Sequence, residues 1–289
     1  MSGTKLGVVY MLTGSFLFAV TMAFAKLLSH SMGAVEVTFW RNIVGLIIVL
    51  WMVWRNPMQN RGGMFATLIF RGIIGTAALI VFFYTIGATS LSSAVVYAKT
   101  EPIFTALLAF FILKERLGYV SIFAIVIGFI GIAVLGRFEI DSLQVIGVMT
   151  GFLAALAYTS VRSLKGYYDE KAVVLSFMGF GTIIPLVLMM AGAFYKFPFI
   201  DDKLAVYVSP QGLDWLWIVM MGSFAALAQI FMTKAYYAAP AGIVSAASYS
   251  VVLFATIFGI MLGDIYPSSE VLIGGALIIL SGVLLVYSK

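Results

Sequence analysis

The sequence predicts an all-α membrane protein whose ten transmembrane helices form two inverted five-helix repeats. Three observations lead to this prediction: an apolar composition, a series of bilayer-length apolar runs, and a likeness between the two halves. Of the 289 residues, 63% are hydrophobic and only 10% are charged, whereas a soluble domain carries about 25% charged residues. The interior of a bilayer is about 30 Å thick, and roughly 20 apolar residues in a helix cross it. A chain of this composition is therefore expected to lie mostly within a membrane.

Runs of that length follow one another with only short polar segments between them. In the first half they cover residues 6–28, 35–54, 64–87, 91–113 and 119–135. In the second half they cover residues 145–161, 172–195, 213–236, 242–262 and 271–287. The first run is longer than the roughly 7 to 15 apolar residues of a signal peptide, so we expect it to be retained as a helix.

Composition also narrows the chemistry. There is no cysteine and one histidine, which excludes disulfides, thiol nucleophiles and the Cys/His sites that hold zinc. The net charge of +5 is spread thinly along the chain, unlike the basic patch of a nucleic-acid-binding protein. The phosphate-binding loop of ATPases and the H-E-x-x-H motif of metalloproteases are missing from the sequence. We therefore expect no enzymatic activity, no cofactor, no metal and no nucleic-acid partner.

The Lys and Arg residues between the runs predict the orientation. Ten crossings place both termini on one side of the membrane, and short cytoplasmic segments carry the excess of Lys and Arg. With the termini inside, the inner segments hold Lys5, Arg55, Arg61, Lys114, Arg116, Arg162, Lys165, Lys171 and Lys289. The outer segments hold Arg137, Lys196 and Lys203. This bias predicts cytoplasmic termini and a location in the cytoplasmic (inner) membrane of a bacterium.

The fourth and ninth runs align with a constant offset. Residues 91–95 lie over 240–244, and Glu115 at the end of one run lies over Asp264 at the end of the other. Because each half holds an odd number of crossings, the second copy must enter the membrane from the opposite face. We therefore expect residues 1–140 to superpose on 141–289 by a rotation of about 180° around an axis in the membrane plane, as in alternating-access transporters.

At these residues the chain resembles the drug/metabolite transporter superfamily, and specifically its EamA-type ten-helix members. The most specific part runs from Glu101-Pro102 to Lys114-Glu115 and is similar to the Pro-to-Glu signature that closes the fourth helix of that family's repeat. The second half departs from the signature, because Val251 stands where the proline would fall and Asp264 where the glutamate would. The resemblance, which covers the whole chain, implies a central cavity between the halves and the export or exchange of small metabolites.

Three basic residues within the runs have structural interpretations. Arg41 lies two turns inside the second run, beside Asn42 and in reach of Glu36 on the preceding turn, so a structural role is expected. Lys26 lies near one end of its run and is expected to extend to the interface. Arg71 lies one or two turns inside the third run and is interpreted as an interface anchor.

Lys99 and Glu101 are the strongest site candidates, because they fall near the middle of the fourth run. A charge at that depth costs about 2.5 to 3.5 kcal/mol. Two positions apart on a regular helix, the side chains point in opposite directions and cannot pair. Pro102 removes one helical hydrogen bond and is expected to kink the helix there. The alternative is that Glu101 pairs with Arg41 or Arg71, and Lys99 with backbone oxygens, purely for assembly.

Hydroxyl-bearing side chains accompany this pair on both aligned runs. They are predicted to line a shared cavity, and the alternative is packing between helices. The candidates are Ser93 and Tyr97 on the fourth run, Ser245, Ser248 and Tyr249 on the ninth, and Tyr84 and Tyr158 on neighbouring runs. Pro102, Glu115 and Arg41 are expected to be structural.

The leading functional hypothesis is a secondary transporter that exports a small polar organic metabolite by alternating access. Lys99 would meet a carboxylate and Glu101 an amine or a coupling proton, which favours an amino acid or a similar zwitterion. One alternative is the exchange of a larger nucleoside-like or anionic metabolite such as S-adenosylmethionine or a sugar phosphate. Another is a membrane protein with a structural or interaction role and no transport activity.

The orientation can be tested directly, because the chain has no native cysteine. A cysteine replacing Ser2 is expected to escape a membrane-impermeant thiol reagent added to intact cells, because the N-terminus is predicted to face the cytoplasm. His30→Cys, in the first outer segment, is the matched control that should react. Labelling of Ser2→Cys from outside would show that the protein has the opposite orientation.

Overall fold

The structure is a computed structural model, and it describes residues 3–59, 61–113, 118–135, 141–194, 206–239, 244 and 247–287. These residues form helices and no named β-strand. The first half holds α1 (Gly3–Leu28), α2 (Ala34–Arg55), α3 (Phe65–Ala88), α4 (Leu91–Ala98), α5 (Glu101–Leu113) and α6 (Tyr119–Leu135). The second half holds α7 (Ser142–Ser163), α8 (Glu170–Phe194), α9 (Asp214–Ala238), α11 (Ser250–Met261) and α12 (Ser269–Tyr287).

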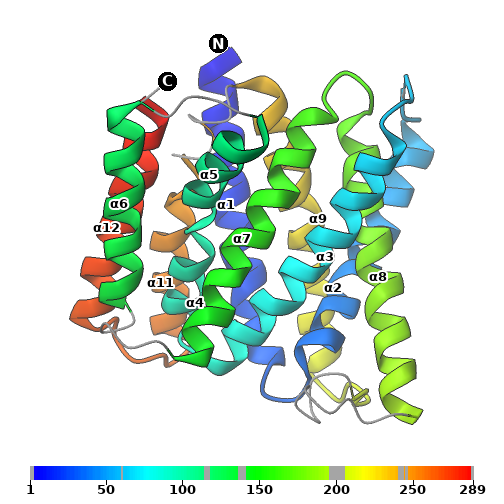
Figure 1. Cartoon of the computed structure of the whole chain (residues 1–289). Coiled ribbons are helices and arrows are strands. Elements are labelled where there is room, and N and C mark those ends of the chain that lie inside the picture. Colours follow the sequence, from blue (N-terminus) through cyan, green and yellow to red (C-terminus); the bar gives the residue numbers. More distant parts are fainter. Residues whose placement is uncertain are drawn as a thin grey trace.

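The predicted all-α membrane fold is confirmed. Within the described residues, six helices are long and apolar enough to cross a membrane by themselves: α1, α2, α3, α7, α8 and α9. Both ends of the chain lie at the same end of the bundle, as an even number of crossings requires (Figure 1).

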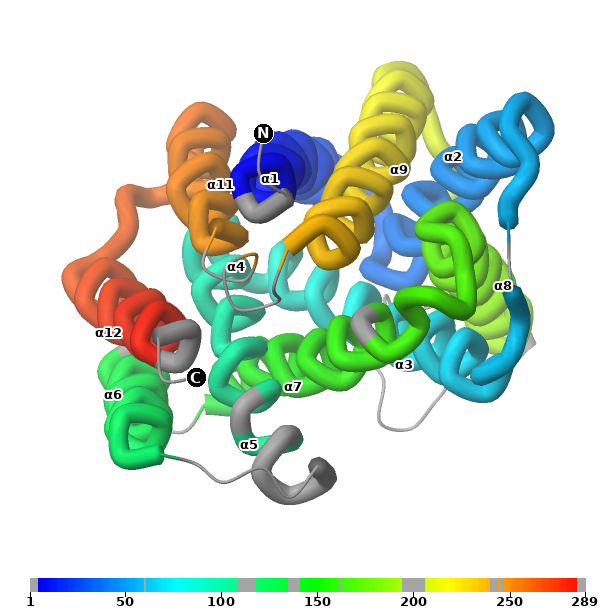
Figure 2. Tube along the Cα trace, turned by 90° about the horizontal axis from the view of Figure 1, so that it is seen from above, coloured from blue at the N-terminus to red at the C-terminus, as the bar shows by residue number. Residues whose placement is uncertain are grey.

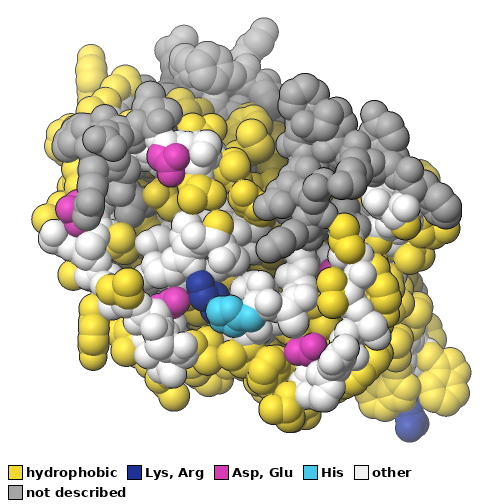
Figure 3. Space-filling model, turned by 90° about the horizontal axis from the view of Figure 1, so that it is seen from below, with side chains coloured by type: hydrophobic (Ala, Val, Ile, Leu, Met, Phe, Trp, Pro, Cys, Tyr) yellow, Lys and Arg dark blue, Asp and Glu magenta, His cyan; other side chains and the backbone are white. Residues whose placement is uncertain are grey.

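The outer surface of the bundle is apolar. Large side chains are exposed along several helices; Trp54 is 74% exposed and Leu253 is 63% exposed. Seen from below, hydrophobic side chains dominate the described surface and charged ones are few (Figure 3). An apolar surface of this extent needs a nonpolar surrounding, which a bilayer provides.

The fourth predicted run, 91–113, is divided into two helices, which corrects the expectation of one continuous helix. Helix α4 ends at Ala98 and α5 begins at Glu101. Pro102 has no N–H to donate to the carbonyl four residues before it, so one helical hydrogen bond is lost at this point. Instead, the Ile103 N–H donates to Thr100 O (3.0 Å). The kink expected at Pro102 is therefore a full interruption.

The ninth predicted run, 242–262, is interrupted at the aligned position. Residues 247 and 248 are helical, Tyr249 forms a turn, and α11 begins at Ser250. The Val252 N–H donates to Tyr249 O (3.0 Å), which is the counterpart of the bond between Ile103 and Thr100. This interruption forms with Val251 at the proline position, so it depends on tertiary packing and not on proline chemistry alone.

The helices pair across the two halves. Helix α1 packs along α9 and α3 along α7, while α2 packs with α8 and α6 with α12. Helix α4 contacts α11 near the middle of the bundle, and the α6–α12 pair forms one edge (Figure 2). Interchanging α1 with α7, α3 with α9, α2 with α8, α5 with α11 and α6 with α12 maps the α1–α9 contact onto α3–α7 and the α1–α11 contact onto α5–α7, as expected for an inverted repeat.

Candidate functional site

A cavity opens between the two halves where the interrupted helices meet. Its volume is about 140 Å³, and part of it is open to the surroundings. Along α1 its lining extends from Met22 to Met11, toward the end that carries the termini. Its ionisable lining residues are Arg41, Arg71, Lys99, Glu101, Tyr158 and Tyr236.

Lys99 joins the two interrupted helices. It lies at the end of α4, and its Nζ donates to Ser248 Oγ (2.8 Å), the residue that aligns with it in the second half. Its Nζ also lies 5.7 Å from the centroid of the Tyr249 ring. The partners of Lys99 are thus a hydroxyl and an aromatic ring. The alternative in which Lys99 serves only assembly predicts backbone oxygens instead. Neither partner carries a countercharge.

Glu101 begins α5 and is only 4% exposed. Its Oε1 accepts a hydrogen bond from the Thr105 hydroxyl (3.3 Å). Lys99 is near enough for its charge to act on Glu101, but in the described parts of the chain Glu101 forms no ion pair. The alternative in which Glu101 pairs with Arg41 or Arg71 is not what the structure contains. The Glu101 carboxylate at the cavity wall therefore has no described residue as an ion-pair partner.

Arg41 and Arg71 line the cavity. The burial of Arg71 there corrects its interpretation as an interface anchor, while the structural role expected for Arg41 stays a prediction. Each is only 2% exposed. Both guanidinium groups lie over the ring of Phe177 in α8, with Cζ at 5.4 Å from the centroid for Arg41 and 4.5 Å for Arg71. Arg41 Nη1 also donates to Asn42 Oδ1 (2.9 Å).

Glu36 does not neutralise Arg41, although the sequence places it within reach. Its Oε1 accepts from Trp40 Nε1 (3.1 Å) and its Oε2 from the Val208 N–H (2.9 Å). Both carboxylate oxygens are therefore engaged at the N-terminal end of α2. Within the described residues neither Arg41 nor Arg71 takes part in an ion pair.

The contacts of the guanidinium groups with the Phe177 ring do not offset the cost of holding their charges inside a membrane. A guanidinium over an aromatic ring gains about 0.5 to 2 kcal/mol, while a charge held inside a membrane costs about 2.5 to 3.5 kcal/mol on insertion scales. With all groups ionised, the cavity carries three cations, Arg41, Arg71 and Lys99, against one carboxylate, Glu101. Water or an anionic solute in the cavity would offset the remaining cost of these charges.

Tyr158 and Gln229 also contribute polar groups to the wall. Tyr158 in α7 lies within electrostatic range of Arg41, Arg71 and Glu101. Gln229 in α9 is 3% exposed and lines the cavity. Sequence reasoning found Tyr158 and missed Gln229. The signal for Gln229 in the sequence is a large amide side chain in the middle of an apolar run.

Several predicted site residues lie outside the cavity lining. Tyr97 packs with Val96 and Ile278, and Tyr84 packs against the main apolar core. Ser93 accepts a hydrogen bond from the Ser90 hydroxyl (2.8 Å) at the start of α4. Tyr249 borders Lys99, but its hydroxyl is buried without a hydrogen-bond partner among the described atoms. Ser245 and Glu115 lie outside the described residues.

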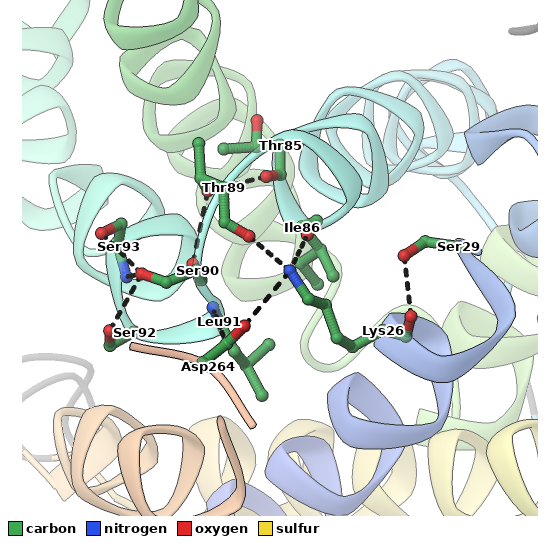
Figure 4. A network of polar contacts seen from close by, with 10 residues as sticks. All are labelled: Lys26, Ser29, Thr85, Ile86, Thr89, Ser90, Leu91, Ser92, Ser93 and Asp264. Carbon is green, nitrogen blue, oxygen red and sulfur yellow. Dashed lines mark hydrogen bonds and ion pairs between the residues drawn. The ribbon is translucent and has the colours of Figure 1, made fainter. Parts of the chain in front are cut away.

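A polar cluster joins the ends of α1 and α3 to the start of α4 (Figure 4), at the end of the bundle opposite the termini (Figure 1). Lys26 Nζ donates to Thr89 O (2.6 Å) and Ile86 O (3.1 Å) at the end of α3 and lies 3.5 Å from Asp264 Oδ1. Asp264 Oδ2 accepts from the Leu91 N–H (2.7 Å) at the start of α4. Lys26 thus meets partners at the ends of neighbouring helices, and its extension to the interface stays a prediction. We call Lys26, Asp264 and their backbone partners the closing cluster.

Comparisons with known proteins agree with this architecture. Residues 5–137 match the EamA-like transporter family. The chain is 32% identical to a protein described as an uncharacterized transporter of Helicobacter pylori, over 96% of this chain and 94% of the relative. It is 27% identical to the pseudopaline exporter CntI of Pseudomonas aeruginosa, over 99% and 97% of the two chains. A crystal structure with 17% identity superposes with a TM-score of 0.63, covers 98% of this chain and 95% of the other, and supports the fold.

These findings define a multi-pass membrane transporter rather than an enzyme. The chain belongs to the EamA-like transporter family, within the drug/metabolite transporter superfamily that the sequence predicted.

The closing cluster leads to a test of access to the cavity. In a protein carrying Ala98→Cys as a reporter at the cavity wall, Asp264→Ala is expected to raise the rate of thiol labelling from the face opposite the termini several-fold. The change removes both the ion pair to Lys26 and the helix-capping contact to Leu91, a loss of about 0.5 to 2 kcal/mol for the cap alone. Asp264→Asn, which keeps an acceptor for Leu91, should give an intermediate rate. Equal labelling of all three proteins would show that the cluster does not close the bundle.

Proposed function

We propose that the chain is a secondary transporter that binds a small polar organic metabolite in the central cavity and exports it by alternating access. The observation that carries the proposal is the meeting of two interrupted helices at Lys99 and Ser248, beside a cavity with ionisable walls. Interrupted helices that meet near the bilayer midplane are how many secondary transporters build their substrate sites.

The proposed mechanism begins with binding beside Lys99. An amino acid or a similar zwitterion fits the pair of groups there, because Lys99 would hold a carboxylate and Glu101 an ammonium group. Tyr158 and Gln229 would orient the rest of the molecule by hydrogen bonds. These groups come from helices of both halves, so a relative movement of the halves would change the site and the access to it together.

Alternating access is supported by the asymmetry between the two ends. The closing cluster joins α1, α3, α4 and the segment after α11 at one end, whereas the cavity lining extends toward the other. We propose that this is one state of the cycle, and that residues 1–140 and 141–289 form inverted repeats that rock against each other. With the termini in the cytoplasm, as the Lys/Arg bias predicts, the cavity would load from the cytoplasm. The Pseudomonas relative is named an exporter, which supports that direction.

Lys99 provides the first test. In proteoliposomes, Lys99→Met is expected to express normally and to raise the apparent KM of the transported metabolite at least about tenfold, because a charge-assisted hydrogen bond of about 1.5 to 3 kcal/mol is lost. Lys99→Arg should restore part of the affinity. Lys234→Met is the matched control, since Lys234 also lies within an apolar helix but does not line the cavity. Unaltered affinity in Lys99→Met would refute the assignment.

Glu101 provides the second test, of proton coupling. We expect a pH gradient to change the transport rate of the wild-type protein and to leave that of Glu101→Gln unchanged, because the amide cannot gain or lose a proton at this position. Lys99, Tyr158 and Tyr249 lie within electrostatic range of Glu101, so Tyr158→Phe and Tyr249→Phe are the controls that should keep the gradient dependence. If Glu101→Gln responds to the gradient as the wild type does, the carboxylate does not carry the coupling proton.

A further inference from the structure

We propose that Arg41, Arg71 and Phe177 form a second anion-binding subsite in the cavity, so that the transported solute carries at least two negatively charged groups. This inference rests on the proposed transport function and narrows its substrate class. A first negative group would bind Lys99, and a second, a carboxylate or a phosphate, would bind the two guanidinium groups.

The two guanidinium groups are held together without a countercharge. Both lie over one ring, that of Phe177, and they are close enough for their charges to repel each other. Arg41 has a single hydrogen bond to a side chain, that of Asn42. Among the described residues Arg71 donates no hydrogen bond to any group, and the Nε atoms of both arginines are buried without a partner.

Three acidic residues of the described chain, Glu36, Asp264 and Glu101, are engaged elsewhere or serve another group. Glu36 accepts from Trp40 and Val208, and Asp264 belongs to the closing cluster. Glu101 is the one carboxylate among the lining residues of the cavity. Even when Glu101 is ionised, one negative charge faces three positive charges.

The chemistry of the paired guanidinium groups indicates the ligand class. Each guanidinium presents a planar set of N–H donors that matches the oxygens of a carboxylate or a phosphate. A neutral zwitterion brings one carboxylate and one ammonium group, which Lys99 and Glu101 would satisfy, and it would leave Arg41 and Arg71 uncompensated. A solute with a second anionic group compensates all four residues at once.

Gly75 keeps the Arg71 guanidinium in this position. A β-carbon at Gly75 would fall on Arg71 Nη1 and would approach Phe177 Cδ2 to 2.9 Å. The missing side chain in α3 therefore leaves the space that the guanidinium occupies. Gly75 is a positioning residue for the subsite, and Gly75→Ala displaces the charge without removing it.

The experiment uses the full chain reconstituted in liposomes and an isotope-labelled bacterial metabolite extract. The extract is separated into cationic compounds, neutral zwitterions with one anionic group, and compounds with at least two anionic groups, which form the multiply anionic fraction. Accumulated compounds are identified by mass spectrometry. We expect the wild-type protein to accumulate compounds from the multiply anionic fraction. Arg41→Met and Arg71→Met should each lower that uptake at least about tenfold, Gly75→Ala should lower it as well, and Arg71→Lys should retain part of it.

Arg55→Met is the matched control, because Arg55 lies in the same helix as Arg41 and over the rings of Trp51 and Trp54, outside the cavity. It should leave uptake unchanged. Thermal unfolding in detergent separates binding from assembly. Arg71→Met should unfold at the wild-type temperature or above it, since it removes an uncompensated buried charge.

Three results would overturn the subsite. These are uptake from the neutral zwitterionic or cationic fraction alone, uptake of multiply anionic compounds that the arginine variants leave unchanged, or a lower unfolding temperature of Arg71→Met that accounts for its lost uptake. The first two would leave the transport function intact. Absence of wild-type uptake from every fraction would contradict the proposed function itself and the subsite with it.

Discussion

The interior of a membrane does not solvate charge, and this constraint governs the centre of the protein. Three basic side chains and one carboxylate line the cavity between the halves of the bundle, and Arg41, Arg71 and Glu101 are buried. Their partners in the described structure are a serine, a threonine, an asparagine and aromatic rings. These neutral partners offset only part of the penalty for removing ions from water. The contents of the cavity therefore have to offset the rest of this penalty.

The interrupted helices allow the charges to lie there. At the break between α4 and α5, Lys99 leaves the helical path and meets Ser248 at the corresponding break in the second half. Similar counterparts occur near the ends of the bundle. Lys26 donates to backbone carbonyls at the end of α3, and Lys165 donates to Tyr237 O (2.8 Å) at the end of α9. These paired features support the proposed inverted repeat, which explains why one chain presents a related arrangement toward each face.

The sequence predicted the membrane class and the order of the helices well, because both depend on local composition and on the length of apolar runs. It did not predict the break at Tyr249, since no proline stands there and the interruption depends on tertiary packing. The sequence predicts Arg71 at the interface because depth along a helix can be counted from the sequence. The direction in which the Arg71 side chain points cannot be counted from the sequence, because neighbouring helices set the rotation of α3. The structure brings Arg71 and Arg41 to Phe177 through contacts between distant segments.

The central claim is that the cavity holds the transported solute through its charged walls. The most direct measurement is an experimental structure of the full chain in a lipid environment with a compound that it transports. The account predicts density between Lys99 and the Arg41–Arg71 pair, with anionic groups about 3 Å from the Lys99 ammonium and the guanidinium nitrogens. A compound bound outside this cavity, or one that turns uncharged groups toward all three basic side chains, would contradict the account.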